Sequence, residues 1–561
     1  MNRRELLLGL SATLAFSQRA WSDSQELRCD IAVIGGGTGG YAAALAALRN
    51  GMQVVLSEET DWLGGQLTAQ AVPPDEHPWI EKFGSTASYR EYRQNVRNYY
   101  RTHFPLTAEA RSNPYLNPGN GSVSRLTHEF GVSARILEEK LHPYLVLGKL
   151  TILYHHVPES AATRGDFVDT VTLRDVRTDA RRVIHARYFL DATELGDLLT
   201  MAGVESVTGA EAQKTTQEMS ASSTAEPGRS QGVAYCFAMD YLDGEDHTIE
   251  KPTNYEHWKS YSPQLVPAWT GRLLSWTSCK PTNLQPQTGE IAPNGTTSKG
   301  FTDLWAFRRI ADRKNFTAGA YRSDITLVNW PQNDFWLQDL VTATPAERLK
   351  IIASARELSL SLFYWMQTEA PRPDGGIGFR GLRLRPDITG TSDGLAKSVY
   401  IRESRRIQAE FTILQQHMDA EVRKMLFKDT DRAERAEIYS DSVGVGCYRI
   451  DLHPAVGGVN YIDRSCLPFQ IPLGALLPIR VQNQIPACKN IGTTHISNGC
   501  TRLHPVEWNI GEAAGALASF AVSRKKLPRE IRNRQALLRD FQRSLVAQGF
   551  ELAWPNHVHA I

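Results

Sequence analysis

The alternation of apolar and polar residues near the start of the chain predicts a strand, a helix and a second strand in quick succession. Residues 28–34 end in an unbroken apolar run that is typical of a buried strand. Residues 41–49 are rich in alanine and leucine, which favour helix, and Asn50-Gly51 is a natural helix stop. Residues 53–58 repeat the strand pattern. This order predicts a β-α-β unit of an α/β fold.

The turn between the first strand and the helix carries three spaced glycines, Gly35, Gly37 and Gly40. Gly35 permits a tight turn, Gly37 lets the backbone approach a diphosphate, and Gly40 lets the helix pack closely on the strand. The helix N-terminus offers free N–H groups and a positive dipole end to phosphates. Glu58 ends the second strand, where a carboxylate can accept hydrogen bonds from ribose hydroxyls. The unit therefore predicts a dinucleotide site.

A second run of glycines has the same spacing but a different context. Gly376, Gly378 and Gly381 follow residues 369–374, whose two prolines cannot belong to a central strand. Residues 382–386 after them contain no alanine-rich helix. We therefore predict a loop here and no second nucleotide site.

Several later segments also predict regular structure. Residues 186–198 have the pattern of a strand that ends in a turn. Residues 150–154, 167–173 and 182–184 alternate well enough to predict a small β-meander before it. Residues 509–522 are rich in small residues and predict a helix.

These segments, together with the Gly64-Gly65 pair that follows Glu58, resemble the glutathione-reductase-like flavoproteins. Within that group the chain is most similar to the broad family of bacterial FAD-dependent oxidoreductases. The matches at 35–68, 186–198 and 490–518 occur in the family's order. The resemblance implies an interrupted nucleotide domain, in which the strand at 186–198 returns to the sheet and residues 509–522 form the closing helix. They favour FAD over NAD, because a simple NAD domain does not need the last two.

The resemblance implies FAD as the cofactor and assigns residues to it. Gly64, Gly65 and Thr68 are expected near the flavin ring, and the closing helix is expected to point its N-terminus at the pyrimidine edge. A helix N-terminus stabilises the negative charge of reduced flavin, and Arg502 adds to this. The sequence departs from the family pattern at Glu194, where glycine often begins the turn. The full set of expected FAD contacts is Gly35, Gly37, Thr38, Gly39, Gly40, Glu58, Gly64, Gly65, Gln66, Thr68, Asp191, Ala192, Thr193, Gly196, Asp197, Arg502 and Gly511.

The resemblance also implies the domain organisation. We expect a Rossmann-type FAD-binding domain of the glutathione-reductase-like class, with a large α+β substrate domain inserted. The FAD-binding domain is expected in three parts, at 26–75, 150–210 and 485–523. The other predicted segments are a helical or loop insert at 76–149, the substrate domain at 211–484, and a C-terminal helix and tail at 524–561.

The predicted substrate domain is rich in tryptophan. Six of the twelve tryptophans lie between residues 258 and 336. Aromatic side chains interleaved with Asn and Asp suit a polyhydroxylated ligand, but the simpler interpretation is that they fill a second hydrophobic core.

Three side chains are our candidates for catalysis. His453 ends a strand-like stretch and is a candidate base for proton removal. His495 lies close to the expected flavin edge, and Arg405 lies in a segment that resembles a recurring one in the family. His504 and His77 are further options. For each histidine a structural role stays open, and for Arg405 so does a place in a buried ion-pair network.

The first residues predict an export signal. Arg3 and Arg4 precede an apolar run at 6–16 and the small residues around Ser17. Residues 1–17 resemble a twin-arginine signal peptide, with a general secretory signal as the alternative. We therefore expect a periplasmic or secreted protein that starts near Gln18.

Composition and charge exclude several classes of protein. With 42% hydrophobic and 22% charged residues the chain is an ordinary globular one. The net charge of +1 gives no global field for nucleic acid, and no apolar run is long enough for stable membrane insertion. The seven cysteines form no Cys-x-x-Cys and predict small buried side chains, and no motif predicts a metal site.

Together these features predict an exported FAD-dependent oxidoreductase, either a dehydrogenase or an oxidase. A small organic substrate, with polyhydroxylated compounds among the options, would give a hydride to flavin N5. Because no second nucleotide site is predicted, we expect electrons to leave to oxygen, a quinone or a protein carrier. Two alternatives stay open: a redox-neutral flavin-dependent hydratase or isomerase, and a non-catalytic FAD-binding protein.

Overall fold

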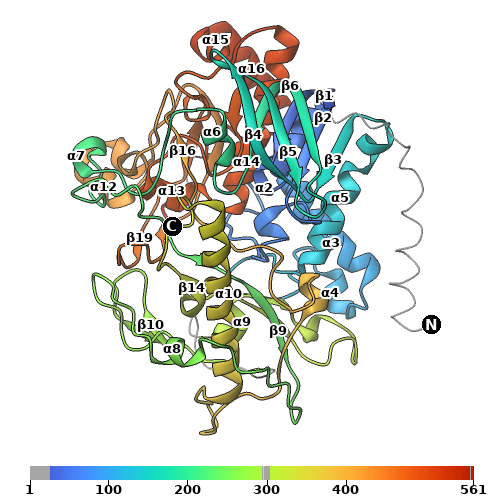
Figure 1. Ribbon diagram of the computed structural model, residues 1–561, viewed down its shortest axis with the longest axis vertical. Helices are drawn as coiled ribbons and strands as arrows, with labels where there is room; N and C mark the ends of the chain where they lie inside the picture. The colour runs from blue at the N-terminus through green and yellow to red at the C-terminus, as the bar shows by residue number, and fades with distance from the viewer. Residues whose placement is uncertain (1–25, 294, 296–302, 429, 556–557) are drawn as a thin grey trace.

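The computed structural model describes most of the chain. The predicted export signal at 1–17 lies outside the described residues. The main sheet and the helices on it occupy the upper part of Figure 1, and the long helix α10 (Pro345–Thr368) crosses the lower part. The described residues are 26–293, 295, 303–428, 430–555 and 558–561.

The predicted β-α-β unit is confirmed. Strand β1 (Glu26–Ile34) leads through the glycine turn into helix α2 (Thr38–Arg49), and strand β2 (Val54–Glu58) returns parallel to β1. Helix α2 is buried from its first residue to Leu48. Its alanines suit that position, because small side chains let a helix lie close to the sheet on one face and to a second helix on the other.

The unit belongs to a seven-stranded, mostly parallel sheet of Rossmann-like type (Figure 1). Strands β3 (Leu150–Tyr154) and β6 (Arg181–Asp191) flank β2 and β1 in parallel, and the short strand β21 (Gln484–Pro486) lies parallel to the end of β6. Strands β4 (His156–Arg164) and β5 (Phe167–Asp175) continue the sheet antiparallel beyond β6. Segments far apart in the chain thus meet in one α/β sheet.

The predicted β-meander is wrong in one of its three strands, residues 150–154. Residues 150–154 form β3, which pairs in parallel with β2, and the meander consists of β4, β5 and β6. Strand β4 escaped prediction because it is an edge strand whose residues are mostly polar and exposed, with Pro158 inside it. A short alternating run such as β3 does not reveal whether its neighbours are parallel or antiparallel.

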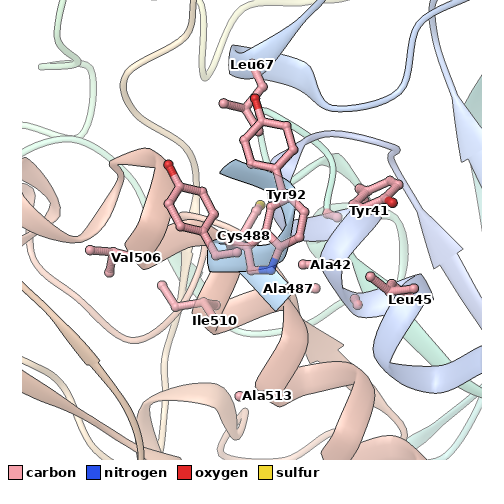
Figure 2. Close-up of a cluster of buried hydrophobic side chains, with 14 of the residues drawn as sticks. Tyr41, Ala42, Leu45, Leu67, Tyr92, Ala487, Cys488, Val506, Ile510 and Ala513 are labelled. Atoms are coloured by element: carbon pink, nitrogen blue, oxygen red, sulfur yellow. The ribbon is translucent and has the colours of Figure 1, made fainter. Parts of the chain in front are cut away.

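A long helix, α14 (His504–Arg524), packs along α2 and holds it against the sheet. Figure 2 shows Ala42 and Leu45 of α2 facing Ile510 and Ala513 of α14. The predicted closing helix therefore exists but begins at His504 rather than at residue 509, with Pro505 in its first turn. Proline is tolerated there because that N–H has no partner within the helix.

A second hydrophobic core confirms the simpler interpretation of the tryptophans. All six between residues 258 and 336 are buried in it, together with one side of α10. Beside it lies an antiparallel sheet whose strands follow the order β12-β13-β9-β15. These strands are β12 (Arg309–Ala311), β13 (Ile325–Val328), β9 (Phe237–Tyr241) and β15 (Leu382–Leu384).

The basic C-terminal segment forms two helices, α15 (Pro528–Asn533) and α16 (Gln535–Ala547), where the sequence predicts one. Leu538, Phe541 and Leu545 are the buried face of α16, in agreement with their helical spacing. No helix in the described ranges is both long and apolar enough to cross a bilayer.

Candidate functional site

The first glycine turn forms a cradle made of backbone. Gly35 has φ +103°, and a Cβ there would lie 2.5 Å from the carbonyl carbon of Ala192. Gly37 caps the N-terminus of α2, and a Cβ on Gly65 would lie 2.8 Å from the Gly37 Cα. The Thr38 hydroxyl donates to Gly64 O at 2.8 Å and so joins the first glycine turn to the turn at Gly64-Gly65. Only glycine permits this approach, and it leaves the N-terminus of α2 facing the cradle.

Other glycines of the expected set serve helix packing. A Cβ on Gly40 would lie 2.9 Å from the side chain of Ala192, and one on Gly511 would lie 2.5 Å from the carbonyl carbon of Gly39. A Cβ on Gly39 would in turn lie 3.0 Å from the carbonyl carbon of Ala487. These residues hold α2 between the sheet and α14, and so fix where its N-terminus points.

Glu58 lies buried at the end of β2, beside the cradle. Its carboxylate accepts hydrogen bonds from the Thr60 N–H and hydroxyl at 2.8 Å, and burial raises its pKa to about 7. A cavity of about 220 Å³ opens next to this segment. Its lining mixes aromatic and apolar side chains with the charged side chains of Asp61, Arg135 and Glu138.

The returning strand ends in a turn that Asp191 shapes. Its carboxylate accepts hydrogen bonds from the Thr193 N–H at 2.9 Å, the Thr193 hydroxyl at 2.7 Å and the Leu199 N–H at 3.2 Å. Burial raises the pKa of Asp191 to about 7. Ala192 donates its N–H to Ile34 O at 2.8 Å, and Gly196 turns the chain with φ +67°. Asp191 therefore braces the wall of the cradle.

Arg405 lies at the same turn. Its guanidinium contacts Asp197 at 3.2 Å and donates to Leu195 O at 3.0 Å. Asp197 is also held by Arg348 of α10 through two hydrogen bonds of 2.8 and 2.9 Å. The structure thus places Arg405 in an ion-pair network that joins the turn to α10, rather than beside His453.

A buried charge cluster adjoins the N-terminus of α2, and no sequence pattern predicts it. Lys489 forms an ion pair with Glu194, and its Nζ lies 3.7 Å from the carboxylate of Glu507. Gln66 donates to the same Glu507 carboxylate at 2.9 Å, and the Gly39 N–H lies 3.4 Å from it. Burial raises the pKa of Glu507 to about 7 although Lys489 lowers it.

Gln66 also leads from the cradle towards the candidate catalytic residues. It donates to Arg502 O at 3.0 Å, and the Arg502 guanidinium donates to Tyr400 OH at 2.9 Å and Asp451 O at 3.0 Å. The same guanidinium lies 3.3 Å from the Asp451 carboxylate. Burial would raise the pKa of Asp451, but its interactions with His453 and with the Arg502 guanidinium hold this pKa far below its usual range.

His453 sits between two carboxylates at the end of strand β18 (Ile450–Leu452). Its Nδ1 lies 2.6 Å from Asp334 and its Nε2 lies 3.5 Å from Asp451. Asp334 is fully buried and is bound by Arg402 at 2.8 Å. The His453 side chain keeps 21% of its surface exposed, so a substrate can reach it. A carboxylate that accepts the Nδ1 proton leaves Nε2 free to act as a base.

His495 occupies a second network behind this one. Its Nδ1 lies 2.9 Å from Glu403, which also binds Arg406 at 2.7 Å. Burial would raise the pKa of Glu403, but His495 and Arg406 lower it to about 2. Gln231 joins the networks, because it donates its N–H to Glu403 and accepts a hydrogen bond from the His453 N–H at 3.3 Å. The His495 network is therefore placed to hold the backbone of His453 in position through Gln231.

The remaining predicted residues lie nearby or farther away. Thr68 donates its hydroxyl to Leu63 O at 2.7 Å, inside the second turn. His504 accepts a hydrogen bond from the Asp75 N–H at 3.0 Å, and burial lowers its pKa to about 4. His77 packs against Trp554 near the C-terminus, where it has a structural contact with Gly84 O.

The chain matches a known family over most of its length. The family model described as FAD dependent oxidoreductase covers residues 30–545. The chain belongs to this family. As an FAD-dependent oxidoreductase, it has FAD as its cofactor.

Solved structures share only parts of the chain. L-proline dehydrogenase from P. horikoshii is 17% identical over 33% of this chain and 24% of its own, with a TM-score of 0.16. The rebeccamycin biosynthetic enzyme RebC with reduced flavin is 16% identical over 38% of this chain and 39% of its own, with a TM-score of 0.21. The myxobacterial chondrochloren halogenase CndH is 15% identical over 39% and 45%, with a TM-score of 0.22. The chain thus spans less than half the length of each. A search of curated proteins finds no match.

The residues of this FAD-dependent oxidoreductase fit its cofactor. Gly37, Thr38 and Gly65 offer backbone to a diphosphate, and Glu58 offers a carboxylate to a ribose. Buried polar atoms that find no hydrogen-bond partner among the described residues lie along the path to His453. They are Gln66 Oε1, Arg502 Nε, His504 Nε2, Arg402 Nε and Tyr461 OH. Buried polar groups are normally paired, so these atoms are open to partners on a cofactor or substrate; partner-less atoms in the described part of the chain also lie elsewhere, as at Trp269 and Gln484.

Proposed function

We propose that the protein oxidises a small polar organic substrate, with His453 accepting the proton that leaves as the substrate gives up a hydride. FAD, when bound, supplies the two-electron acceptor. The observation that carries the proposal is the buried path from the glycine cradle through Gln66 and Arg502 to Asp451 and His453. It puts a partly exposed imidazole next to the polar atoms expected around FAD.

The neighbours of His453 prepare it for this role. Asp334 orients the ring through Nδ1 and stabilises the positive charge that the ring gains with a proton. Arg402 lies 2.8 Å from Asp334 and gives this buried carboxylate a cation as its partner. Asp451 lies near Nε2 and is held by Arg502, so it can accept a hydrogen bond from the protonated ring.

The partner-less polar atoms support a substrate with several hydroxyl or similar groups. Tyr461 packs its ring against His453 with centroids 5.4 Å apart, and its buried hydroxyl has no partner in the described ranges. The free Nε atoms of Arg402 and Arg502 are further donors. Aliphatic substrates would leave these groups unpaired, which costs binding energy.

We also propose the finer architecture that the resemblance implies. In this view the sheet and the helices α2 and α14 form a glutathione-reductase-like FAD-binding domain, and residues 211–484 form its substrate domain. The second hydrophobic core supports a separate substrate domain, because most of its members fall within that range.

We also propose that the protein is exported and that its electrons leave without a nicotinamide cofactor. The basic and apolar pattern of residues 1–17 supports export through a twin-arginine signal. Nicotinamide is scarce outside the cytosol, and residues 376–381 lie in a loop rather than a second β-α-β unit. We therefore propose that oxygen, a quinone or a protein carrier reoxidises the enzyme.

An anaerobic substrate panel tests the proposed function. Sugars, amines and hydroxy acids are mixed with the holoenzyme, and loss of the visible flavin absorbance is followed. We expect at least one polyhydroxylated donor to bleach the flavin. Fast bleaching by NADPH, with none by any organic donor, would instead show a reductase or monooxygenase.

A further inference from the structure

The space directly above the glycine cradle is taken by the side chain of Glu194. A Cβ on Gly37 would lie 2.7 Å from Glu194 Oε1, and within 4 Å it would meet only this carboxylate among the described residues. A Cβ on Gly65, on the other side, would lie 3.1 Å from the same oxygen. A diphosphate that rests on Gly37 at the N-terminus of α2 requires this same space.

Two anions cannot share that space. Lys489 brings a buried ammonium to it, but Glu194 and Glu507 already give the cluster two carboxylates for one cation. Glu58 lies near enough for Glu194 to raise its pKa further. A diphosphate would add two more negative charges in a region that burial already makes unfavourable for them.

We propose that Lys489 is the cation that pairs with the FAD diphosphate, and that Glu194 holds this ammonium until the diphosphate replaces it. The exchange keeps Lys489 paired at every stage, and a buried ammonium without a partner would be strongly destabilising. The side chain of Glu194 is 23% exposed, so it can swing towards solvent. Charge-assisted bonds from Lys489 and the N–H groups of α2 then hold the diphosphate together.

The exchange explains why the turn departs from the glycine that the family often has at position 194. A glycine there would leave Lys489 with Glu507 alone, at 3.7 Å. With glutamate, FAD binding becomes a competition between a side chain and a cofactor for one cation. The inference concerns cofactor binding and does not depend on His453 or on the identity of the substrate.

Titration of deflavinated protein with FAD tests the exchange. Glu194→Gln keeps the shape of the side chain but removes its charge, so we expect FAD to bind at least tenfold more tightly, as followed by flavin fluorescence. Lys489→Met is expected to bind FAD at least tenfold more weakly, with partial rescue in Lys489→Arg. Lys526→Met removes an exposed ammonium from a surface pair with Glu530 and serves as the control with unchanged affinity.

A second readout separates a diphosphate contact from a merely structural lysine. ADP and adenosine are each used to displace FAD, because they differ in the diphosphate. We expect Lys489→Met to weaken ADP at least tenfold and to leave adenosine unchanged. The proposal would be overturned if Lys489→Met lost the same affinity for ADP and for adenosine. It would also be overturned if Glu194→Gln bound FAD no more tightly than the unaltered protein. If Lys489→Met does not fold, the Glu194→Gln titration decides alone.

Discussion

Replacement of Gly511 by alanine tests how closely α14 must approach α2. The new Cβ would clash most severely with the carbonyl oxygen of Gly39, and it would lie 2.5 Å from the carbonyl carbon of that residue. Ordinary contacts begin at 3.4 Å, so the clash with the carbon alone requires the two helices to separate by about 0.9 Å, and the oxygen requires more. Gly515 packs on Ala43 in the same way one turn later, so α14 cannot simply tilt aside.

The cost follows from the atoms that clash. Overpacking of a core costs about 1–3 kcal/mol when side chains can adjust. Here the atoms struck belong to the backbone of α2, which cannot rotate away, so we expect about 3 kcal/mol. The displacement also moves Gly39 and the N-terminus of α2, which form the cradle. Gly511→Ala should therefore lose FAD as well as stability.

The assay is the ratio of visible to ultraviolet absorbance of the purified protein, followed by thermal unfolding. Gly228→Ala is the matched control, because Gly228 is exposed and its Cβ would meet no atom of the described residues within 4 Å. Gly131 of helix α5 (Phe130–Val146) is unsuitable, since it lines the cavity beside Glu58. We expect the control to keep its FAD and its unfolding temperature. A Gly511→Ala protein with full FAD content and natural unfolding temperature would refute the reasoning.

Two further predictions concern stability away from the cofactor. Thr344 caps α10 and shares a capping box with Glu347, so Thr344→Ala should cost about 1 kcal/mol in a urea titration, whereas Thr344→Ser should cost little. Hydrogen bonds from Arg93 and Arg97 overcome the effect of burial and lower the pKa of Glu81 to about 2. The stabilisation from this carboxyl is fully present above pH ~4.5, and up to about 3 kcal/mol of it is lost as the pH falls towards 2. In Glu81→Gln the urea midpoint should therefore fall less steeply between pH ~5 and pH ~3 than in the unaltered protein. An unchanged pH dependence of the midpoint would contradict the ion-pair account.

The parts of the fold that local sequence specifies could be predicted. The β-α-β unit is one, because its strands are continuous apolar runs and its turn needs glycine at Gly35 and Gly37. The closing helix was recognised from its small residues, but its start was misplaced because His504-Pro505 has the pattern of a helix break as well as of a first turn.

The charged side chains of the site could not be predicted in the same way. Lys489 meets Glu194 only because β21 pairs with β6, and no local pattern marks that pairing. His453 was recognised as a candidate base, but its partner Asp334 comes from a distant strand. Burial and ion pairing of this kind depend on the tertiary fold, which a single sequence does not display.

The most direct test of the account is the rate at which a donor from the substrate panel reduces the bound FAD without oxygen. A general base typically contributes a factor of about 10²–10⁴, so His453→Gln should slow flavin reduction by at least about 100-fold while FAD stays bound. His142 lies on the exposed face of α5, so the flavin of the His142→Gln control should be reduced at the same rate as that of the unaltered protein. Reduction of the His453→Gln protein at the natural rate would contradict the account.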